Sequence, residues 1–230
     1  MPGKTLLVIG SGSGIGVHTA TAFSVRGFTH IALVSRNPTR LEKDWNQVLE
    51  AVQERGYSCQ VKTWACDCSD LAALNATLKE IEGFGTLECV LFNAARVAGS
   101  PPLEESIEMI EKDFRTTNLA LYATAQWAIP LLKQAPASNS PSLFVTSTTS
   151  LYKEPVPDLV SLSMVKSAQR ALVLSLHAKY GSEVHVGLLS IGGVVAPEKK
   201  NLSPENIADM AWELYQQRRE SWQREMEIEE

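Results

Sequence analysis

Short apolar runs alternate along the chain with longer amphipathic segments. The apolar runs predict six buried strands, at about residues 6–9, 30–35, 58–65, 87–92, 142–147 and 184–189. Apolar positions with helical spacing predict helices at about residues 17–26, 39–55, 70–82, 107–133, 158–180 and from 204 onward. Helices that alternate with near-continuous apolar strands are typical of a parallel sheet covered on both faces. The pattern therefore predicts a single α/β domain over residues 1–230, with a doubly wound parallel sheet in three layers.

Cap residues mark where several of the helices begin. Asp70 and Asp158 precede two of them, and Ser203 is followed by proline and glutamate, an arrangement typical of a helix start. The only sharp shift in composition is the charged segment 218–230, in which residues 225–228 have the pattern of a short edge strand. Because charges dominate this segment, we expect a solvated tail there.

Composition and charge argue against several classes of protein. Of the 230 residues, 44% are hydrophobic and 20% are charged, as in an ordinary globular protein. The net charge of −5 argues against a nucleic-acid-binding protein, which carries a basic surface. No apolar run approaches the roughly 18 residues that span a membrane, and residues 1–5 lead straight into the first strand without a signal peptide. We therefore expect a cytoplasmic protein with no membrane or nucleic-acid partner.

Four cysteines lie in or beside the predicted strands. Cys66 and Cys68 are separated by one residue, whereas zinc sites usually place about two to four residues between their thiolates. We expect both, together with Cys59 and Cys89, to be small buried hydrophobic side chains in a reducing compartment, with no metal bound.

A glycine-rich turn joins the first strand to the first helix. It comprises Gly10, Ser11, Gly12, Ser13, Gly14, Ile15 and Gly16. Glycines let the backbone turn tightly and approach a diphosphate, and the following helix presents free N–H groups and the positive end of its dipole. The turn therefore predicts a phosphate-binding loop. The alternative is a tight turn without a ligand, because such turns also use glycine for structural reasons alone.

The second strand ends in residues that suit a phosphorylated ribose. Ligands of a doubly wound sheet bind beyond the carboxyl ends of its strands, and a free ribose 2′-hydroxyl would call for an acidic residue here. The chain instead has Ser35, Arg36 and Asn37, with Arg40 one helical turn further on. A hydroxyl and a guanidinium suit a 2′-phosphate, so we expect NADP(H) in preference to NAD(H). A solvated arginine in a turn is the alternative.

The third and fourth strands also end in recognisable motifs. The third ends in Asp67 and Cys68, and the fourth in Asn93, Ala94 and Ala95. Together with the spaced glycines of the loop, these motifs resemble the short-chain dehydrogenase/reductase family over nearly the whole chain. The resemblance implies a Rossmann-type fold, an NADP(H) site formed by the loop and these strand ends, contact of Asp67 with the adenine amino group, and a homodimer. It also implies oxidation or reduction of a small-molecule alcohol or carbonyl compound.

The same resemblance identifies the active-site positions. Lys166 matches the family's lysine, which binds the nicotinamide ribose, and Asn118 matches its helix-kinking, water-binding asparagine. Thr149 takes the place of the family's serine, with the two hydroxyl residues before it as alternatives. The tyrosine that gives or takes the substrate proton falls at Leu162, which has no proton to donate. Because a positioned general acid contributes roughly 10²–10⁴ in rate, hydride transfer would need a substitute proton donor.

Three hydroxyl side chains near Leu162 in the sequence are candidates for that substitute, namely Tyr152, Ser161 and Ser163. An alcohol is a poor acid, and we expect Tyr152 to pack on the surface. After the sixth strand Gly192 keeps the family's turn, but Val194 stands where a threonine would contact the nicotinamide. The link from there to the last helix is short, so we expect a small lid over a substrate pocket whose lining residues include Arg96, Val97, Tyr152 and Val194.

Three functional hypotheses remain open. The first is an NADP(H)-dependent reductase or dehydrogenase with a degenerate active site. The second is a non-redox enzyme such as a cyclase or isomerase, for example in natural-product biosynthesis, which holds its substrate in a reactive shape. The third is a cofactor-binding protein without turnover. The retained Lys166 and Asn118 favour the first.

Overall fold

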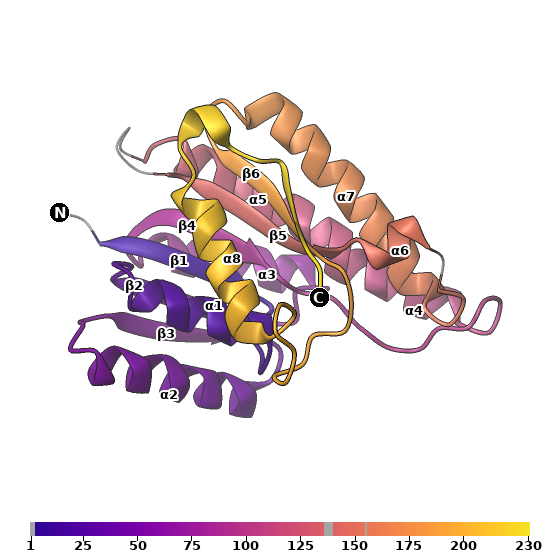
Figure 1. The fold of residues 1–230 in the computed structure, drawn as a ribbon, viewed down its shortest axis with the longest axis horizontal. Helices are drawn as coiled ribbons and strands as arrows, with labels where there is room; N and C mark the ends of the chain where they lie inside the picture. The colour runs from indigo at the N-terminus through magenta and orange to yellow at the C-terminus, as the bar shows by residue number, and fades with distance from the viewer. Residues whose placement is uncertain (1–2, 136–139, 155) are drawn as a thin grey trace.

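Seven parallel strands form one sheet in the computed structural model, which describes residues 3–135, 140–154 and 156–230 apart from the side chain of Tyr152. Their order across the sheet is β3-β2-β1-β4-β5-β6-β7 (Figure 1). The strands are β1 (Lys4–Ile9), β2 (His30–Ser35), β3 (Gln60–Ala65), β4 (Thr86–Phe92), β5 (Ser142–Thr148), β6 (His185–Ile191) and β7 (Glu225–Ile228).

Helices cover both faces of this sheet. One hydrophobic core lies under α3 (Leu71–Glu82), α5 (Ala120–Leu132) and α7 (Val160–Tyr180). The other lies under α1 (Ile15–Ser24), α2 (Pro38–Glu54) and α8 (Pro204–Gln216). The remaining helical segments are α4 (Ile107–Phe114), the π-helical turn Arg115–Leu119, α6 (Ser150–Lys153) and the 3₁₀ turn Arg219–Ser221.

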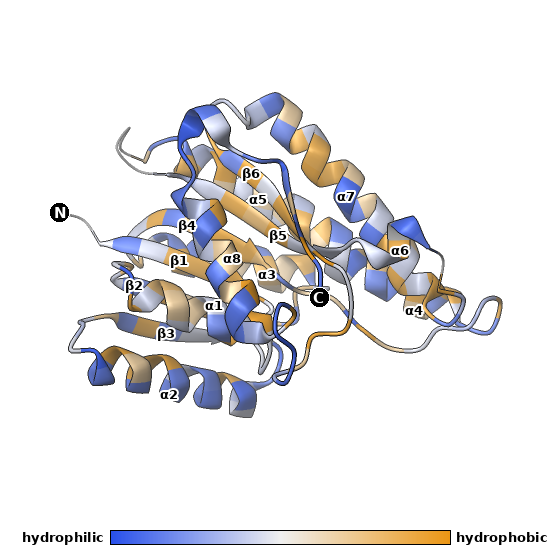
Figure 2. Ribbon diagram, viewed as in Figure 1, coloured by the Kyte–Doolittle hydropathy of each residue, from blue (hydrophilic) through white to orange (hydrophobic). Residues whose placement is uncertain are grey.

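The strands inside the sheet are apolar on both faces because both faces are covered, whereas β3, at the edge of the sheet, is mostly exposed. Successive side chains of a strand point to opposite sides, so Leu7 and Ile9 of β1 enter one core while Leu6 and Val8 enter the other. Figure 2 shows the strands as mainly hydrophobic and α2 as hydrophilic on its outer turns. The predicted three-layer, doubly wound α/β fold is confirmed.

The order of the strands reverses direction at β1. The chain runs from β1 outward to β2 and β3, then crosses back to β4 on the other side of β1. Connections leave the sheet in opposite directions at this point, which opens a crevice beyond the carboxyl ends of β1 and β4. The glycine turn after β1 and the residues after β4 therefore lie at the ligand-binding edge of the sheet.

The predicted long helix is two helices joined by a π-helical turn. Residues Arg115–Leu119 form the turn between α4 and α5, and Asn118 lies within it. A π-turn bonds each residue to the fifth residue before it and commonly marks a functional site. The Asn118 side chain donates from Nδ2 to the Val165 carbonyl oxygen at 3.0 Å, which bonds the turn to α7.

Two of the three predicted cap residues are confirmed. Asp70 accepts hydrogen bonds from the N–H groups of Ala72 and Ala73, and Ser203 accepts one from Asn206. The prediction for Asp158 was wrong, because α7 begins at Val160 and its cap residue makes no side-chain hydrogen bond. Ser100 takes the place of the cap, because its carbonyl oxygen accepts from the Val160 N–H and its hydroxyl oxygen accepts from the Ser161 N–H, both at 3.1 Å.

The charged tail is a strand, so the expectation of a solvated end was wrong. Residues Glu225–Ile228 pair in parallel with residues 188–191 of β6. Arg170 donates two hydrogen bonds to the Glu225 carboxylate, the shorter at 2.6 Å, and the Ser190 hydroxyl donates a third at 2.7 Å. Glu225 is thus paired with α7 and β6, and Glu227 and Glu229 form ion pairs with Lys153 of α6.

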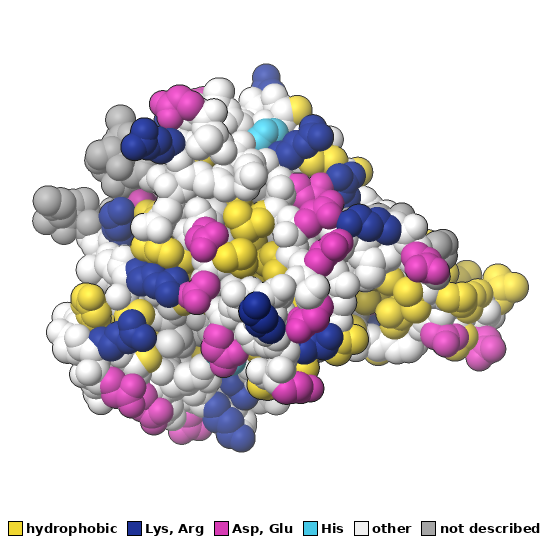
Figure 3. Space-filling view, viewed as in Figure 1, with side chains coloured by type: hydrophobic (Ala, Val, Ile, Leu, Met, Phe, Trp, Pro, Cys, Tyr) yellow, Lys and Arg dark blue, Asp and Glu magenta, His cyan; other side chains and the backbone are white. Residues whose placement is uncertain are grey.

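Exposed hydrophobic side chains gather at the end of the molecule where α4 and α6 lie (Figure 3). Val97 is 76% exposed, Ile107 is 71% exposed, and Leu103 is fully exposed with a backbone φ of +66°. Because α6 follows directly on β5, this apolar surface borders the carboxyl-end edge of the sheet.

Candidate functional site

The glycine turn lies in contact with the backbone of the neighbouring strand. Gly10 has a φ of +92°, and a Cβ atom added there would lie 2.6 Å from the Ala94 nitrogen. A Cβ atom on Gly16 would lie 2.9 Å from the Gly10 carbonyl oxygen. Around Gly12 and Gly14, by contrast, an added Cβ atom would meet nothing within 4 Å. The turn is therefore packed tightly on its inner side and open on its outer side, which is the shape of a cradle for a ligand.

The helix after this turn begins without a side-chain cap. The cap residue of α1 is Gly14, which has no side chain to accept a hydrogen bond from the helix. The first turn contains no acidic residue. An uncapped helix start with the positive end of the dipole favours an anion. The cradle and the helix start together fit a phosphate group.

A line of hydrogen bonds runs from the glycine turn across the sheet to α7. Asn93 donates from Nδ2 to the Gly10 carbonyl oxygen at 2.9 Å, and its Oδ1 accepts from the Thr146 hydroxyl at 2.8 Å. The Thr146 carbonyl oxygen in turn accepts from Lys166 Nζ at 2.8 Å. Residues from β1, β4, β5 and α7 are thereby fixed relative to one another.

Lys166 is buried, and burial lowers the pKa of its ammonium group to about 7. Its Nζ also donates to Gln169 Oε1 at 2.9 Å, and Gln169 Nε2 donates to the Thr117 carbonyl oxygen in the π-turn. Sequence reasoning did not find Gln169, although it lies one turn after Lys166 on the same helix face. A buried lysine with neutral partners can lose its proton near neutral pH.

The π-turn also brings an unpaired oxygen to this region. Within the described part of the chain, Asn118 Oδ1 is buried and has no hydrogen-bond partner. Buried polar atoms are usually satisfied, often by an ordered water. The Asn118 oxygen therefore suits a bound water molecule.

The hydroxyl group predicted at the end of β5 lies beside the turn that ends β6. Thr149 is 2% exposed, and its N–H donates to the Ile191 carbonyl oxygen at 3.2 Å. A Cβ atom on Gly192 would lie 3.4 Å from Thr149 Oγ1. Val194 is 77% exposed, so its side chain lies open at the same edge of the sheet.

Leu162 lies in an apolar cluster near the start of α7. It is 6% exposed and packs with Leu151 and Val165. The two serines considered as proton donors are directed elsewhere, because Ser161 donates to an Asp113 carboxylate oxygen at 2.6 Å and Ser163 donates to the Leu159 carbonyl oxygen. The side chain of Tyr152, the third candidate, lies outside the described part of the structure.

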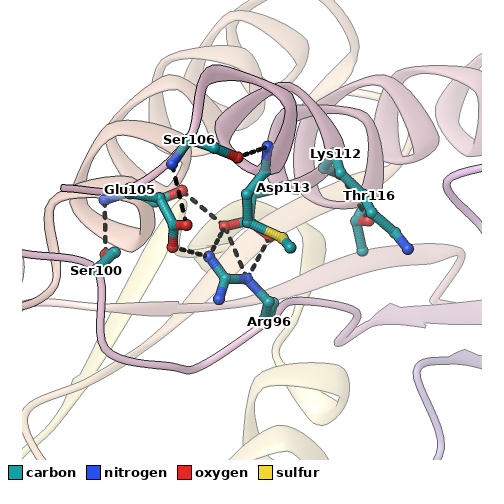
Figure 4. A network of polar contacts seen from close by, with 9 residues as sticks. Arg96, Ser100, Glu105, Ser106, Lys112, Asp113 and Thr116 are labelled. Carbon is teal, nitrogen blue, oxygen red and sulfur yellow. Dashed lines mark hydrogen bonds and ion pairs between the residues drawn. The ribbon is translucent and has the colours of Figure 1, made fainter. Parts of the chain in front are cut away.

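Arg96 was predicted to line the substrate pocket, but ion pairs hold it against α4 (Figure 4). Its guanidinium donates to both oxygens of Asp113, at 2.9 and 2.8 Å, and to Glu105 at 2.7 Å. These bonds raise the pKa of Arg96 and hold it charged. Arg96 therefore ties the segment after β4 to α4 and, through Asp113, to Ser161 of α7.

The end of β2 carries the predicted basic corner. Arg36 is exposed, and Asn37 caps α2 by accepting a hydrogen bond from the Arg40 N–H at 3.0 Å. Ser35 is half-buried next to them. The Arg40 guanidinium bonds to the buried carboxylate of Asp44, a residue that sequence reasoning did not find.

Asp67 and Cys68 follow β3, and their pKa values are shifted in opposite directions. Burial opposes ionisation of Asp67, but hydrogen bonds from the Ser69 N–H and hydroxyl and the charge of Arg36 lower its pKa. Burial raises the pKa of the Cys68 thiol to about 12. Cys66, Cys68 and Cys89 are buried free thiols and Cys59 is partly buried, in agreement with their predicted role as small hydrophobic side chains.

The described residues contain neither a metal-binding cluster nor a membrane-spanning helix. No group of three or more His, Cys, Asp or Glu side chains in them is arranged to hold a metal ion. None of the helices in that part of the chain is long and apolar enough to cross a membrane.

A family model for short chain dehydrogenases matches residues 4–207. Among curated proteins, the chain is 25% identical to a fatty acyl-CoA reductase of Acinetobacter baylyi, covering 90% of this chain and 71% of the relative. It is 26% identical to a fatty acyl-CoA reductase of Mycobacterium tuberculosis, covering 86% of this chain and 65% of the relative, so it spans about two thirds of the length of these relatives. Among solved structures, a metagenomic short-chain oxidoreductase in complex with NADP has a TM-score of 0.84 at 20% identity, covering 98% of this chain and 96% of that one.

Proposed function

We propose a function from one premise: this chain belongs to the short-chain dehydrogenase family. We infer that it binds NADP(H) and oxidises or reduces a small-molecule alcohol or carbonyl compound, with Leu162 in place of the catalytic tyrosine. The bound nicotinamide would supply or accept the hydride. The residues of the chain would bind the cofactor, orient the substrate and move the proton.

The line of hydrogen bonds from Gly10 to Lys166 carries this proposal. It joins the turn proposed to hold the diphosphate to the lysine proposed to hold the nicotinamide ribose. Both ends of a dinucleotide would thus contact parts of one rigid network. A rigid network of this kind orients reacting groups without further ordering when the ligand binds.

The proposed cofactor residues lie at the ends of five strands and in α7. They are the glycine turn Gly10, Ser11, Gly12, Ser13, Gly14, Ile15 and Gly16, the β2 end Ser35, Arg36 and Asn37, the β3 end Asp67 and Cys68, the β4 end Asn93, Ala94 and Ala95, and Lys166, Gly192 and Val194. Arg36 and Arg40 support NADP(H) over NAD(H), because a guanidinium binds a 2′-phosphate through charge-assisted hydrogen bonds.

The proposed active site contains Lys166, Asn118 and Thr149, with Leu162 at the position where the family resemblance places the tyrosine. Thr149 would hold the substrate oxygen. A water molecule that donates a hydrogen bond to Asn118 Oδ1 would provide the route for the proton. Loss of a positioned acid lowers the rate by roughly 10²–10⁴. We therefore propose slow turnover, or turnover of a substrate whose oxygen needs little protonation.

Direct binding and turnover measurements test this function. Purified protein is titrated with NADPH and NADH, then mixed with NADPH and a panel of aldehydes, ketones and fatty acyl-CoA thioesters while the 340 nm absorbance is followed. The fatty acyl-CoA compounds are included because of the two relatives described above. We expect tighter binding of NADPH and slow oxidation that is lost in Lys166→Ala. Bound NADPH that no compound oxidises would exclude redox turnover.

The apolar cluster around Leu162 favours a second candidate, a non-redox enzyme on the same scaffold. Leu151, Leu162 and Val165 form a buried hydrophobic cluster where a proton donor is expected. With an apolar side chain in place of the proton donor, a substrate held in a reactive shape could still react without acid catalysis. A cyclisation or isomerisation that proceeds in Lys166→Ala would favour this candidate, whereas loss of all activity in that variant would favour the first.

A further inference from the structure

Asp44 is a charged residue at a core position of α2. The buried face of this helix is formed by Leu41, Val48 and Val52, and Asp44 lies on the same face with no exposed surface. Burying a carboxylate is unfavourable unless it is paired and hydrogen-bonded. An apolar side chain would fill this position without that penalty, so the carboxylate calls for an explanation.

The partners of Asp44 come from two separate parts of the cofactor site. Its Oδ2 accepts a buried hydrogen bond of 2.6 Å from the hydroxyl of Ser11, in the glycine turn. Its Oδ1 accepts a hydrogen bond of 2.6 Å from Nε of Arg40, in the first turn of α2, and a second guanidinium nitrogen also contacts it. One buried carboxylate therefore bonds the proposed diphosphate cradle to the proposed 2′-phosphate corner.

The position of Arg40 is unfavourable for the helix itself. The positive end of the helix dipole disfavours a cation in the first turn, and exposed Arg36 adds a second positive charge just before the helix. Asp44 already pairs with Arg40, and the charge of Arg36 acts on Asp67, so an anion at this corner would add to these two carboxylates. A guanidinium has five N–H donors, so Arg40 retains donors for an anion while it is bonded to Asp44.

We propose that Asp44 is a positioning residue for a nucleotide that carries a 2′-phosphate on its adenosine. It orients the Arg40 guanidinium toward that phosphate and fixes the Ser11 hydroxyl and the glycine turn for the diphosphate. This inference rests on the proposed function, because it requires that the site hold a dinucleotide.

The Asp44→Asn substitution should change the affinity for NADPH in opposite directions, depending on whether Asp44 is a positioning residue or only a nearby negative charge. If Asp44 were only a nearby negative charge, its removal would tighten binding of the doubly charged 2′-phosphate. If Asp44 positions Ser11 and Arg40, its removal weakens NADPH binding by tenfold or more and NADH binding by less. Both dissociation constants are measured by fluorescence titration, and melting of the ligand-free protein checks that the variant is folded.

Two further variants keep the test decisive if Asp44→Asn fails to fold. Ser11→Ala releases only the glycine turn, so it should weaken NADPH and NADH binding equally, because both contain the diphosphate. Arg40→Met leaves the buried carboxylate without its cation and should weaken NADPH binding more than NADH binding. The matched control is Glu42→Gln, an exposed carboxylate on the same helix, which should change neither affinity.

The binding measurements distinguish failure of the proposed function from failure of the role proposed for Asp44. If the unmodified protein binds neither nucleotide, the proposed function and this inference both fall. If the unmodified protein prefers NADPH but Asp44→Asn and Ser11→Ala bind it as well or better, only the role of Asp44 is overturned.

Discussion

The Leu162 side chain can be changed to the residue that the family resemblance predicts at its position. Leu162→Tyr places a hydroxyl within the cluster formed with Leu151 and Val165. If the rest of the site is competent, a positioned acid should raise kcat by roughly 10²–10⁴ and leave the NADPH dissociation constant unchanged. The measurement is NADPH oxidation with the best carbonyl compound of the panel. Leu162→Phe is the control, and an equal gain in that variant would contradict acid catalysis by the new hydroxyl.

Lys166 predicts a particular dependence of stability on pH. Burial lowers its pKa in the folded protein to about 7, from the ordinary lysine value of 10.5. Between these values the unfolded chain binds more protons than the folded protein, so the free energy of unfolding rises with pH, by at most about 1.4 kcal/mol per pH unit. Urea unfolding at pH 7.0–8.5 should show this rise, and Lys166→Met should flatten it. An equal rise in both proteins would assign it to other groups.

At the scale of elements, the β7 strand depends on paired charges. Arg170 and Ser190 hold the Glu225 carboxylate, which is partly buried. Arg170 is more than a third exposed, so solvent screening limits the pair, and Glu225→Gln should lower the free energy of unfolding by about 1–2 kcal/mol. Urea unfolding measures the change. Glu220→Gln, an exposed carboxylate in the adjoining turn, should have almost no effect.

The elements predicted from sequence were those with a strong apolar pattern. Five buried strands, the more exposed edge strand β3 and the main helices follow from local periodicity, which is a property of neighbouring residues. The pattern of an edge strand at residues 225–228 was recognised, but a solvated tail was preferred because the pairing of Glu225 with Arg170, 55 residues away in the chain, leaves no local signal. The π-turn was suggested only through the resemblance at Asn118, because one extra residue in a helical turn leaves the hydrophobic pattern almost unchanged.

At the scale of the whole molecule, the surface of α5 and α7 suits a second copy of the chain. A groove of about 670 Å³ lies between these helices and is lined by residues that include Tyr122, Ile129 and Tyr180. Tyr122 is 49% exposed. We propose a homodimer through this face, for which light scattering should give twice the chain mass. Tyr122→Glu should produce monomers, whereas Tyr57→Glu, at an exposed tyrosine after α2, should not. A monomeric mass for the unmodified protein would contradict the dimer.

Sequence reasoning predicted the residues at the strand ends better than the contacts between them. The topology brings the ends of β1, β2, β3 and β4 to one edge, so the glycine turn, Arg36, Asp67 and Asn93 lie there as predicted. The link between Asp44 and Ser11 spans 33 residues and depends on how α2 packs on the turn. The ion pair between Arg96 and Asp113 likewise depends on the position of α4, which no local pattern specifies.

The close packing of Gly10 and Gly16 bears on the thermodynamics of ligand binding. With the inner side of the turn pressed against the backbone of Asn93 and Ala94, the turn has little conformational freedom left to lose. The turn loses its conformational entropy when the protein folds, and it does not lose that entropy again when a ligand binds. A nucleotide that enters the cradle should therefore bind quickly and with a small entropic penalty. A side chain at Gly10 would push the turn out of this packing, so the turn would become ordered, and lose its conformational entropy, only when the nucleotide binds.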